Sequence, residues 1–252
     1  MKRITALLVF IIFSITVFAQ SDSWYFSFSM GRSFPLDAYK QTDIGNKSSG
    51  YAQNGFNLIL DATFPLSDHF GVKGMASINS NPVDRKMLGT MLETRIPTSI
   101  SIPTLADHQY LSLSTNAWMW NALMAGAVYT FNFNRIHWDF QVLGGMNVTY
   151  LPQQKLSYEK PTNNWYYSDI NTTNSNISYG VLAGTALRFP ITNRFNLKVA
   201  IDYFKSGANI KYEQLKVSTQ GETIVTEQIG SGTAYIPISS VSGSIGFVYY
   251  LN

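Results

Sequence analysis

The residues best suited to catalysis surround one histidine. His108 follows Asp107 and precedes Ser112 and Ser114, and these residue types could form a Ser-His-Asp arrangement that acts on lipid. Loops bring such residues together by chance, so the pattern is not specific. We therefore expect no catalytic site, and a lipid-acting enzyme that uses His108 is an alternative hypothesis.

Six charged residues fall on the polar face of segments in which apolar and polar residues alternate. A buried charge is tolerated only when it is paired, so these residues predict a network of ion pairs that fills a closed interior. An ion path through the same groups is the alternative. The six residues are Asp61, Lys73, Asp139, Arg188, Lys198 and Asp202.

Aromatic residues in two long polar segments could bind a partner. Exposed aromatic side chains stack on sugars and anchor protein partners. Alternatively, they pack within their own loops or extend a band of aromatic residues at a membrane surface. The candidates are Tyr110, Tyr158, Trp165, Tyr166 and Tyr167.

The composition excludes several other kinds of site. There is no cysteine, which rules out disulfides, thiolate metal sites, a catalytic thiol and an acylated cysteine. No spacing of histidines or carboxylates suits a metal and no glycine-rich loop suits a phosphate, so we expect no metal and no cofactor. Of the 18 Lys and Arg, two lie in a leader; the remaining 16 face 15 Asp and Glu, a balance with no general attraction for nucleic acid.

The first 19 residues have the pattern of a cleaved secretory signal peptide. Lys2 and Arg3 precede an apolar run at 4–18, and Val17 and Ala19 supply the small residues that signal peptidase requires. An uncleaved anchor is the alternative, although the run is shorter than the roughly 20 residues of a spanning helix. We expect residues 1–19 to be the signal peptide and residues 20–252 to form one domain.

The elements that position these residues are β-strands, because apolar residues recur at every second position. At 56–64, for example, Phe56, Leu58 and Leu60 alternate with Asn57 and Asp61, which places the two sets on opposite faces of a strand. The same pattern predicts eight strands joined alternately by tight turns and by long polar connections at 35–50, 80–116, 151–176 and 207–236. The predicted strands are 24–34, 51–65, 69–79, 117–133, 136–150, 177–190, 194–206 and 237–251.

The three tight turns each fix a register that can be tested. We predict that Phe64 pairs with Phe70, Phe133 with Ile136, and Phe189 with Phe195. These pairings set Asp61 opposite Lys73 and Arg188 opposite Asn196, and every hairpin then keeps its polar and apolar faces consistent.

Two bands of aromatic residues would point outward from such a barrel. One band lies beside the tight turns, and the other lies near the opposite strand ends. Bands of this kind bracket the apolar belt of a membrane barrel. A secreted soluble barrel with inverted faces is the alternative. The first band is Phe64, Phe70, Phe131, Phe133, Trp138, Phe189 and Phe195, and the second is Phe56, Tyr150, Tyr179 and Tyr203.

The segment 179–190, with glycines four apart before an aromatic-ended strand and a tight turn, resembles the small outer-membrane β-barrel families of Bacteroidota-type bacteria, which include OmpA-like transmembrane barrels. Segments 140–150 and 244–251 look similar. The resemblance implies an all-β, eight-stranded, antiparallel up-and-down barrel with short periplasmic turns and four long extracellular loops. It implies little about activity.

We expect a non-catalytic barrel of the bacterial outer membrane with a side-chain-plugged interior. Its partners would be outer-membrane lipid and another envelope protein or a surface glycan, with no nucleic acid. It would display loops for partner binding or act as an accessory subunit of an envelope transport or secretion complex. A narrow channel for small solutes is the second hypothesis.

Overall fold

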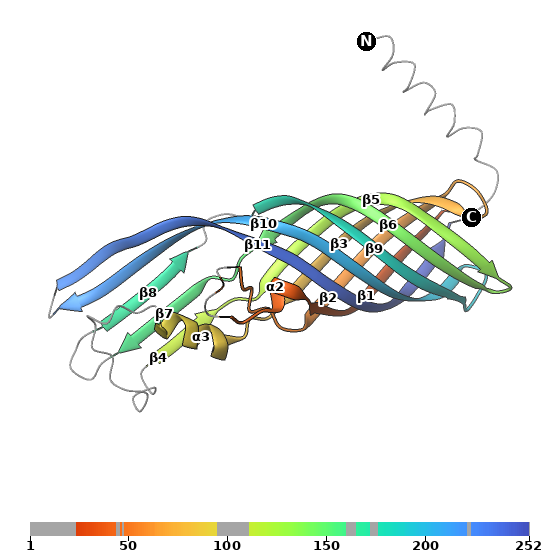
Figure 1. The fold of residues 1–252 in the computed structure, drawn as a ribbon. Helices are drawn as coiled ribbons and strands as arrows, with labels where there is room; N and C mark the ends of the chain where they lie inside the picture. The colour runs from red at the N-terminus through yellow and green to blue at the C-terminus, as the bar shows by residue number, and fades with distance from the viewer. Residues whose placement is uncertain are drawn as a thin grey trace, which may run out of the picture.

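The computed structural model describes residues 24–43, 46, 48–94, 111–159, 165–171, 176–220 and 223–251. Within them, eight antiparallel strands form a closed barrel (Figure 1), which confirms the predicted fold class. The segment interpreted as a signal peptide, 1–19, lies outside the described residues. The barrel strands are β1 (Tyr25–Pro35), β2 (Gly55–Pro65), β3 (Phe70–Asn81), β5 (Trp118–Phe133), β6 (Ile136–Tyr150), β9 (Asn176–Pro190), β10 (Phe195–Gln220) and β11 (Thr223–Tyr250).

The barrel closes because β11 pairs with both β1 and β10. Following the strand register once around the barrel from Phe195 returns to β10 at Lys205, ten residues further along. A stagger of this kind requires strands that tilt by roughly 35–45° from the barrel axis. The stagger decides which inward side chains meet across the interior.

At the end of the barrel with the long connections, three further strands extend the sheet beside β10 (Figure 1). Strands β8 (Trp165–Asn171), β7 (Gln154–Glu159) and β4 (Leu111–Thr115) add to β10 in that order. Two short helices, α2 (Asp37–Lys40) and α3 (Arg85–Thr94), also belong to this end. None of the helices in the part of the chain that the structure describes is long and apolar enough to cross a membrane.

The long connection predicted at 207–236 is more ordered than expected, because β10 and β11 continue into it as paired strands up to Gln220 and from Thr223. Their register shifts once, between Gln214 and Leu215. The sequence at 211–220 has little apolar alternation, so the pattern that identified the other strands is absent there. Backbone pairing of β10 with β11 on one side and β8 on the other makes this segment a strand.

The two-residue turn between β5 and β6 has the predicted register, which is confirmed. Phe133 lies opposite Ile136, and Thr130 lies opposite Asp139. Asn134 begins this turn with a φ of 51°, a left-handed conformation that asparagine tolerates better than most residues.

The predicted register of the β2–β3 hairpin is wrong by two residues. Phe64 lies opposite Val72, not Phe70, so Lys73 lies opposite Thr63 and not Asp61. The turn is tighter than predicted because the Leu66 amide donates to the Phe70 carbonyl at 2.7 Å. A two-residue error preserves the face of every side chain, because strand side chains alternate with period two.

The β9–β10 hairpin departs from prediction in the same way. Phe189 lies opposite Leu197 and Arg188 lies opposite Lys198. The Ile191 amide donates to the Phe195 carbonyl at 2.8 Å, and the Phe195 amide donates to the Thr192 hydroxyl at 3.1 Å. The β2–β3 turn has the equivalent bond from Phe70 to Ser67, so both turns share one Pro-aliphatic-Ser/Thr-Asp/Asn-x-Phe design.

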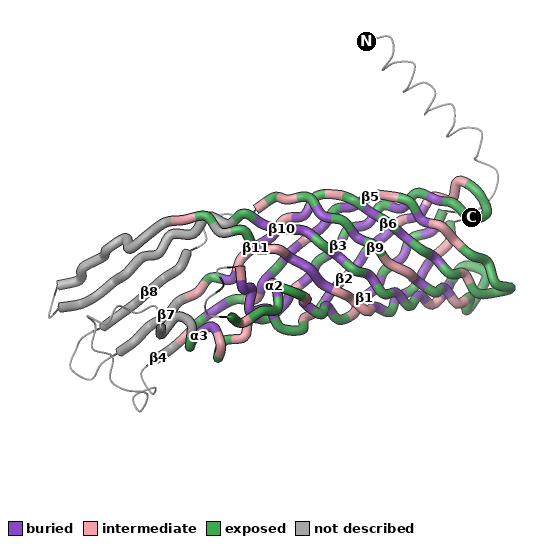
Figure 2. Tube along the Cα trace, viewed as in Figure 1, coloured by how far each residue is buried: buried purple, intermediate pink, exposed green. Residues whose placement is uncertain are grey.

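Inward and outward residues alternate along the barrel strands wherever the structure describes their burial, as the buried and exposed segments in Figure 2 show. The inward set carries the buried charges near the tight turns, and further along it mixes uncharged polar residues with large apolar side chains. The outward set is mostly apolar, with exposed aromatic residues near both ends, and it confirms the predicted faces. These aromatic residues include Phe70, Phe131, Phe133, Trp138 and Phe195 at the tight-turn end, and Phe56, Tyr150, Tyr179 and Tyr203 at the other.

Candidate functional site

An arginine–aspartate pair lies inside the barrel near the tight turns. Arg188 donates from Nε to Asp139 Oδ2 at 2.7 Å and from a terminal nitrogen to Oδ1 at 2.9 Å. The two residues come from neighbouring strands, β9 and β6, and both are buried. Thr130 also donates to Asp139, at 2.7 Å. Two parallel bonds between a guanidinium and a carboxylate form the strongest common type of charged hydrogen bond.

Two tyrosines complete the surroundings of this arginine. The Arg188 guanidinium lies 4.4 Å from the centre of the Tyr25 ring, and it also donates to the Tyr250 hydroxyl. Asn196 donates to the same hydroxyl at 3.2 Å. A cation over an aromatic face gains electrostatic attraction that is larger where water is excluded. The charge of Arg188 is therefore met from two sides by anionic or electron-rich groups.

A second group of charges lies further into the barrel around Asp61. The Lys198 ammonium contacts Asp61 Oδ2 at 2.5 Å, and Lys73 lies 3.7 Å from Oδ1. The Ser27 hydroxyl donates to Asp61 at 2.6 Å and accepts from Lys198 at 2.8 Å. One carboxylate therefore lies between two lysines, with β1, β2, β3 and β10 each supplying a side chain.

An uncharged residue joins this group to the sixth charge. Gln141 accepts from Lys73 at 2.7 Å and donates from its amide nitrogen to Asp202 at 2.5 Å. Space for the Asp202 carboxylate exists because Gly184 lies directly opposite on β9: a Cβ built there would lie 1.9 Å from Asp202 Oδ1. Gly184 of β9 thus leaves the space that the buried Asp202 carboxylate occupies.

The six charged residues singled out from the sequence are all buried, and three cations balance three carboxylates. Five of them form ion pairs, and Asp202 is held by Gln141. A neutral set of buried charges with hydrogen-bonded partners avoids the large cost of an unpaired buried ion. Chemically, this arrangement favours fixed pairing over proton transfer or ligand binding.

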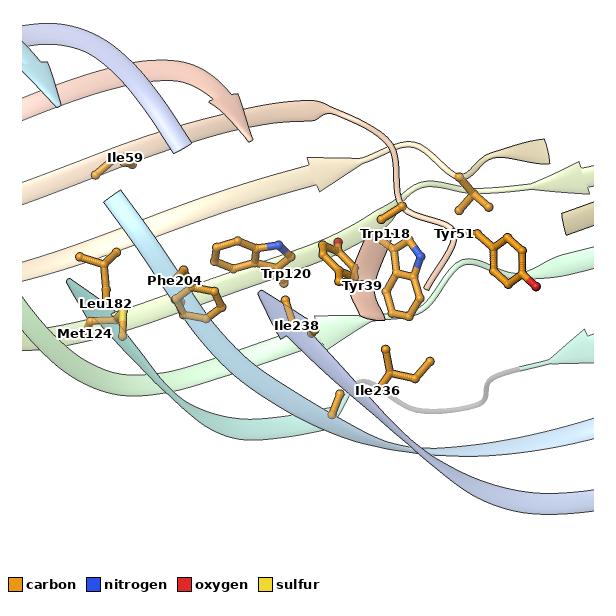
Figure 3. Close-up of a cluster of buried hydrophobic side chains, with 14 of the residues drawn as sticks. Tyr39, Tyr51, Ile59, Trp118, Trp120, Met124, Leu182, Phe204, Ile236 and Ile238 are labelled. Atoms are coloured by element: carbon orange, nitrogen blue, oxygen red, sulfur yellow. The ribbon is translucent and has the colours of Figure 1, made fainter. Parts of the chain in front are cut away.

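Beyond the charges, the interior holds a cluster of buried apolar side chains in which aromatic rings follow one another. Trp120 and Phe204 stack with ring centres 4.1 Å apart and planes 9° from parallel. Figure 3 shows Phe204, Trp120, Tyr39 and Trp118 following one another along the interior. Gly180 admits the Phe204 ring, since a Cβ at Gly180 would lie 2.8 Å from it.

Helix α2 supplies the next part of this aromatic filling. Tyr39 packs edge-on against Trp118 at 5.5 Å and donates its hydroxyl to Asn81 at 3.3 Å. The Trp118 indole donates to the Gly50 carbonyl at 2.7 Å. Burial raises the pKa of the Tyr39 phenol, so the group remains protonated and able to donate.

Sequence reasoning missed several residues of this interior. Gln141 lies two positions after Asp139 on the same polar face, so the alternation could have identified it. Tyr250 also lies on an inward position, but the strand of which it is part was read for its apolar face. The alternation along 195–203 already sets Phe204 on the opposite face from Tyr203, but it could not show that Phe204 stacks on Trp120, because that contact depends on the register of several strands.

The predicted loop residues are placed only in part. Tyr110 and His108 lie outside the described residues. The backbone of β7 sets Tyr158 directly opposite Tyr166 of β8, and Tyr166 and Tyr167 lie on backbone paired with β10. The partner-binding role predicted for these residues stays a prediction.

A cavity of about 660 Å³ opens at the tight-turn end of the barrel. Tyr25, Arg188 and Tyr250 contribute to its lining, and His69 and His137 are also part of it. The His69 ring contacts the Thr130 carbonyl at 3.0 Å, and the His137 ring contacts the Asn132 side-chain oxygen at 2.8 Å. Both histidines therefore make bonds within the protein.

Neither a protein-family profile nor a curated protein sequence matches this chain. Several solved structures are similar. Ail, the attachment invasion locus protein of Yersinia pestis, is 11% identical, with a TM-score of 0.41 and coverage of 91% of this chain and 100% of Ail. Neisserial surface protein A is 12% identical, with a TM-score of 0.42 and coverage of 90% and 97%. A major outer membrane protein from Thermus thermophilus is 10% identical, with a TM-score of 0.48 and coverage of 91% and 100%. At these identities the likeness concerns the fold alone.

Proposed function

We propose that this chain is an integral β-barrel of a bacterial outer membrane, exported by a signal peptide at 1–19. The observation that carries the proposal is the distribution of side chains on the closed barrel. Large apolar residues such as Leu123, Val142 and Ile201 are exposed on the outer surface. The six charged residues of the ion-pair network are instead buried inside the barrel. A water-soluble barrel needs the reverse arrangement, because apolar surface of this extent is stable only against lipid.

The aromatic residues agree with this environment. Contacting rings at the tight-turn end include Phe70 with Tyr129 at 4.7 Å and Trp138 with Phe140 at 4.7 Å. Amphipathic aromatic rings favour the boundary between hydrocarbon and headgroups. The tight turns would then lie in the periplasm and the long connections outside the cell, as in other outer-membrane barrels.

The proposed role is non-catalytic, with a plugged interior. The neutral ion-pair network and the stacked Trp120 and Phe204 support it, because both fill the cross-section with side chains that contact each other. An eight-stranded barrel is only wide enough to be filled in this way. The function would then reside at the long-connection end, which would bind a surface glycan or an envelope protein, or dock the chain into a transport or secretion complex.

Cell fractionation with surface proteolysis tests the location. We expect the mature protein to remain in outer membranes after a carbonate wash, and added protease to cut only in the connections at the long end. Release into the soluble fraction would contradict the proposal, since the apolar face would then have to be a core.

Planar-bilayer recording tests the plugged interior separately. The expected result is no steady conductance from the purified barrel. A stable conductance proportional to salt concentration would favour the narrow channel over the plugged barrel, while leaving the membrane location intact.

A further inference from the structure

The apolar outer surface of the barrel is taller on one side than on the other. On β10 the outward aromatic residues at the two ends of this surface, Phe195 and Tyr203, are eight positions apart, and β2 has the same spacing. On β6 the outward residues Trp138 and Tyr150 are twelve positions apart, and Ile177 lies twelve positions from the last aromatic residue of β9. Strands rise about 3.3 Å per residue and tilt by roughly 35–45°, so four extra positions add about 10 Å of height.

The top of the taller side is a patch of exposed apolar residues. Met119 on β5 lies opposite Tyr150 on β6, and Ile177 on β9 lies opposite Val148 on β6. The apolar band of an outer-membrane barrel is about 25 Å tall, whereas twelve positions of a tilted strand span about 30 Å, so the top of this patch lies outside the hydrocarbon. Exposed apolar surface of this kind marks an interaction site. The four residues of this upper patch are Met119, Tyr150, Ile177 and Tyr179, which is 83% exposed.

Below the upper patch, the outer wall has a row of very small residues. Gly74 on β3, Ala125 on β5 and Gly144 on β6 lie opposite one another on the outward face. Gly144 is two positions from Met146, which lies opposite Tyr179 of the upper patch. A Cβ built on Gly74 would meet no atom within 4 Å, so the wall is hollowed here. Small residues let the backbones of membrane helices approach closely, and a row of them allows the same between two barrel walls.

The same face carries an amide without a complete set of partners. Asn121 follows Met119 by two positions on β5 and lies opposite Val148 on β6. Its side-chain oxygen has no hydrogen-bond partner within the part of the chain that the structure describes. The terminal torsion of asparagine is soft, so the amide can turn outward. An amide both donates and accepts, so the identical amide of a second copy could satisfy it.

We propose that the face formed by the upper patch and the row of small residues binds the same face of a second copy, so that the barrel is a symmetric dimer. The inference rests on the proposed membrane location and adds an assembly to it. Lipid chains cover the row of small residues but not the top of the patch, and a water-soluble partner covers the patch but not the row. A second copy covers both, because its own face has the same height.

The symmetry and the size of this face agree with a dimer. Both copies insert in the same direction, so a two-fold axis along the membrane normal brings identical residues together. A face about 30 Å tall and three to four strands wide gives about 500 Å² on each copy. The total of about 1,000 Å² is near the lower limit for a specific interface. The dimer is therefore expected to be reversible.

The test measures dimer formation by the full mature chain in phosphatidylcholine vesicles. The chain has no cysteine, so Arg135→Cys in a tight turn at the other end of the barrel gives one labelling site for a donor or an acceptor dye. Energy transfer between labelled copies is followed as the protein is diluted with lipid. We expect Gly74→Leu to weaken the dimer about tenfold, because its side chain holds the walls apart, and Asn121→Ala to weaken it about threefold.

Gly243→Leu is the matched control for Gly74→Leu. Gly243 is an outward glycine on β11, four strands from β5, and its Cβ would also meet no atom within 4 Å. If Gly74→Leu does not fold, Ile177→Lys decides, because Ile177 lies above the hydrocarbon and a lysine there would face its own copy across the axis.

Two results would overturn the dimer: a wild-type chain that shows no transfer beyond chance proximity at any dilution, or equal losses for Gly74→Leu and Gly243→Leu. The outcome is distinguishable from failure of the proposed function. A chain that does not enter the vesicles refutes the membrane location and the dimer with it, whereas an inserted chain that stays monomeric refutes only the dimer.

Discussion

Replacing Arg188 with methionine tests whether the buried charges of the barrel are held by their pairing. The substitution removes the two bonds to Asp139, at 2.7 and 2.9 Å, and leaves a carboxylate that is 0% exposed. Removing one partner of a buried ion pair costs about 3–5 kcal/mol, since the other charge stays buried without compensation. Thr130 still donates to Asp139 at 2.7 Å, so we expect a loss near the lower end, about 3 kcal/mol.

The companion substitution makes this prediction specific to pairing. Asp139→Leu alone should cost a similar amount, because Arg188 would keep only its tyrosine contacts. Arg188→Met combined with Asp139→Leu should cost much less than the sum of the two, because replacing a buried pair by apolar residues is often neutral. The expected coupling energy is about 3 kcal/mol, at the upper end of what contacting residues show.

Urea unfolding of the vesicle-inserted barrel, followed by tryptophan fluorescence, measures these free energies. Arg135→Gln is the control for loss of a positive charge at an exposed site, and should stay within about 0.5 kcal/mol of wild type. Single variants that each cost less than about 1 kcal/mol, or a double variant that costs the full sum, would refute the reasoning. Either result would mean that water solvates these charges inside the barrel.

Three further predictions use the same unfolding measurement. Gly184→Ala should cost about 1–3 kcal/mol because the new Cβ would lie 1.9 Å from the neighbouring carboxylate, whereas Gly74→Ala, whose Cβ would meet no atom within 4 Å, should not destabilise the barrel. Asn134→Val should cost about 1–2 kcal/mol through its φ of 51°, and Asn134→Gly should be tolerated; equal losses for the two would contradict a backbone origin. Trp120→Ala and Phe204→Ala should each cost about 3–5 kcal/mol and show a coupling of about 0.5–1.5 kcal/mol from their stacked rings, which strictly additive losses would disprove.

The sequence alone determined the number of barrel strands and the face to which each side chain belongs. Alternation with period two is a local property, so it identified the buried position of Asp61 and the outward position of Phe56 without knowledge of any partner strand. It also determined the β5–β6 register, because a two-residue turn at Asn134 leaves a single way to pair the strands.

The other two hairpins show where local reasoning stopped. Their registers were wrong by two residues because hydroxyls of Ser67 and Thr192 accept backbone bonds that tighten the turns. The faces stayed right because an error of two residues is one full period. The extension of β10 and β11 was missed for a different reason. The sequence at 211–220 has little apolar alternation, and the backbone pairing of this segment with β11 and β8 has no local sequence signal.

Only the closed barrel decided which charges meet. The predicted register set Asp61 opposite Lys73, but Lys198, 137 residues away in sequence, makes the shorter contact with Asp61. Such a pairing depends on the ten-residue stagger accumulated over eight strands, which no local pattern encodes. The same stagger brings Trp120 against Phe204. Alternation along the sequence therefore determines which face of the barrel each side chain occupies, whereas the contacts across the interior form only after the last strand has paired with the first.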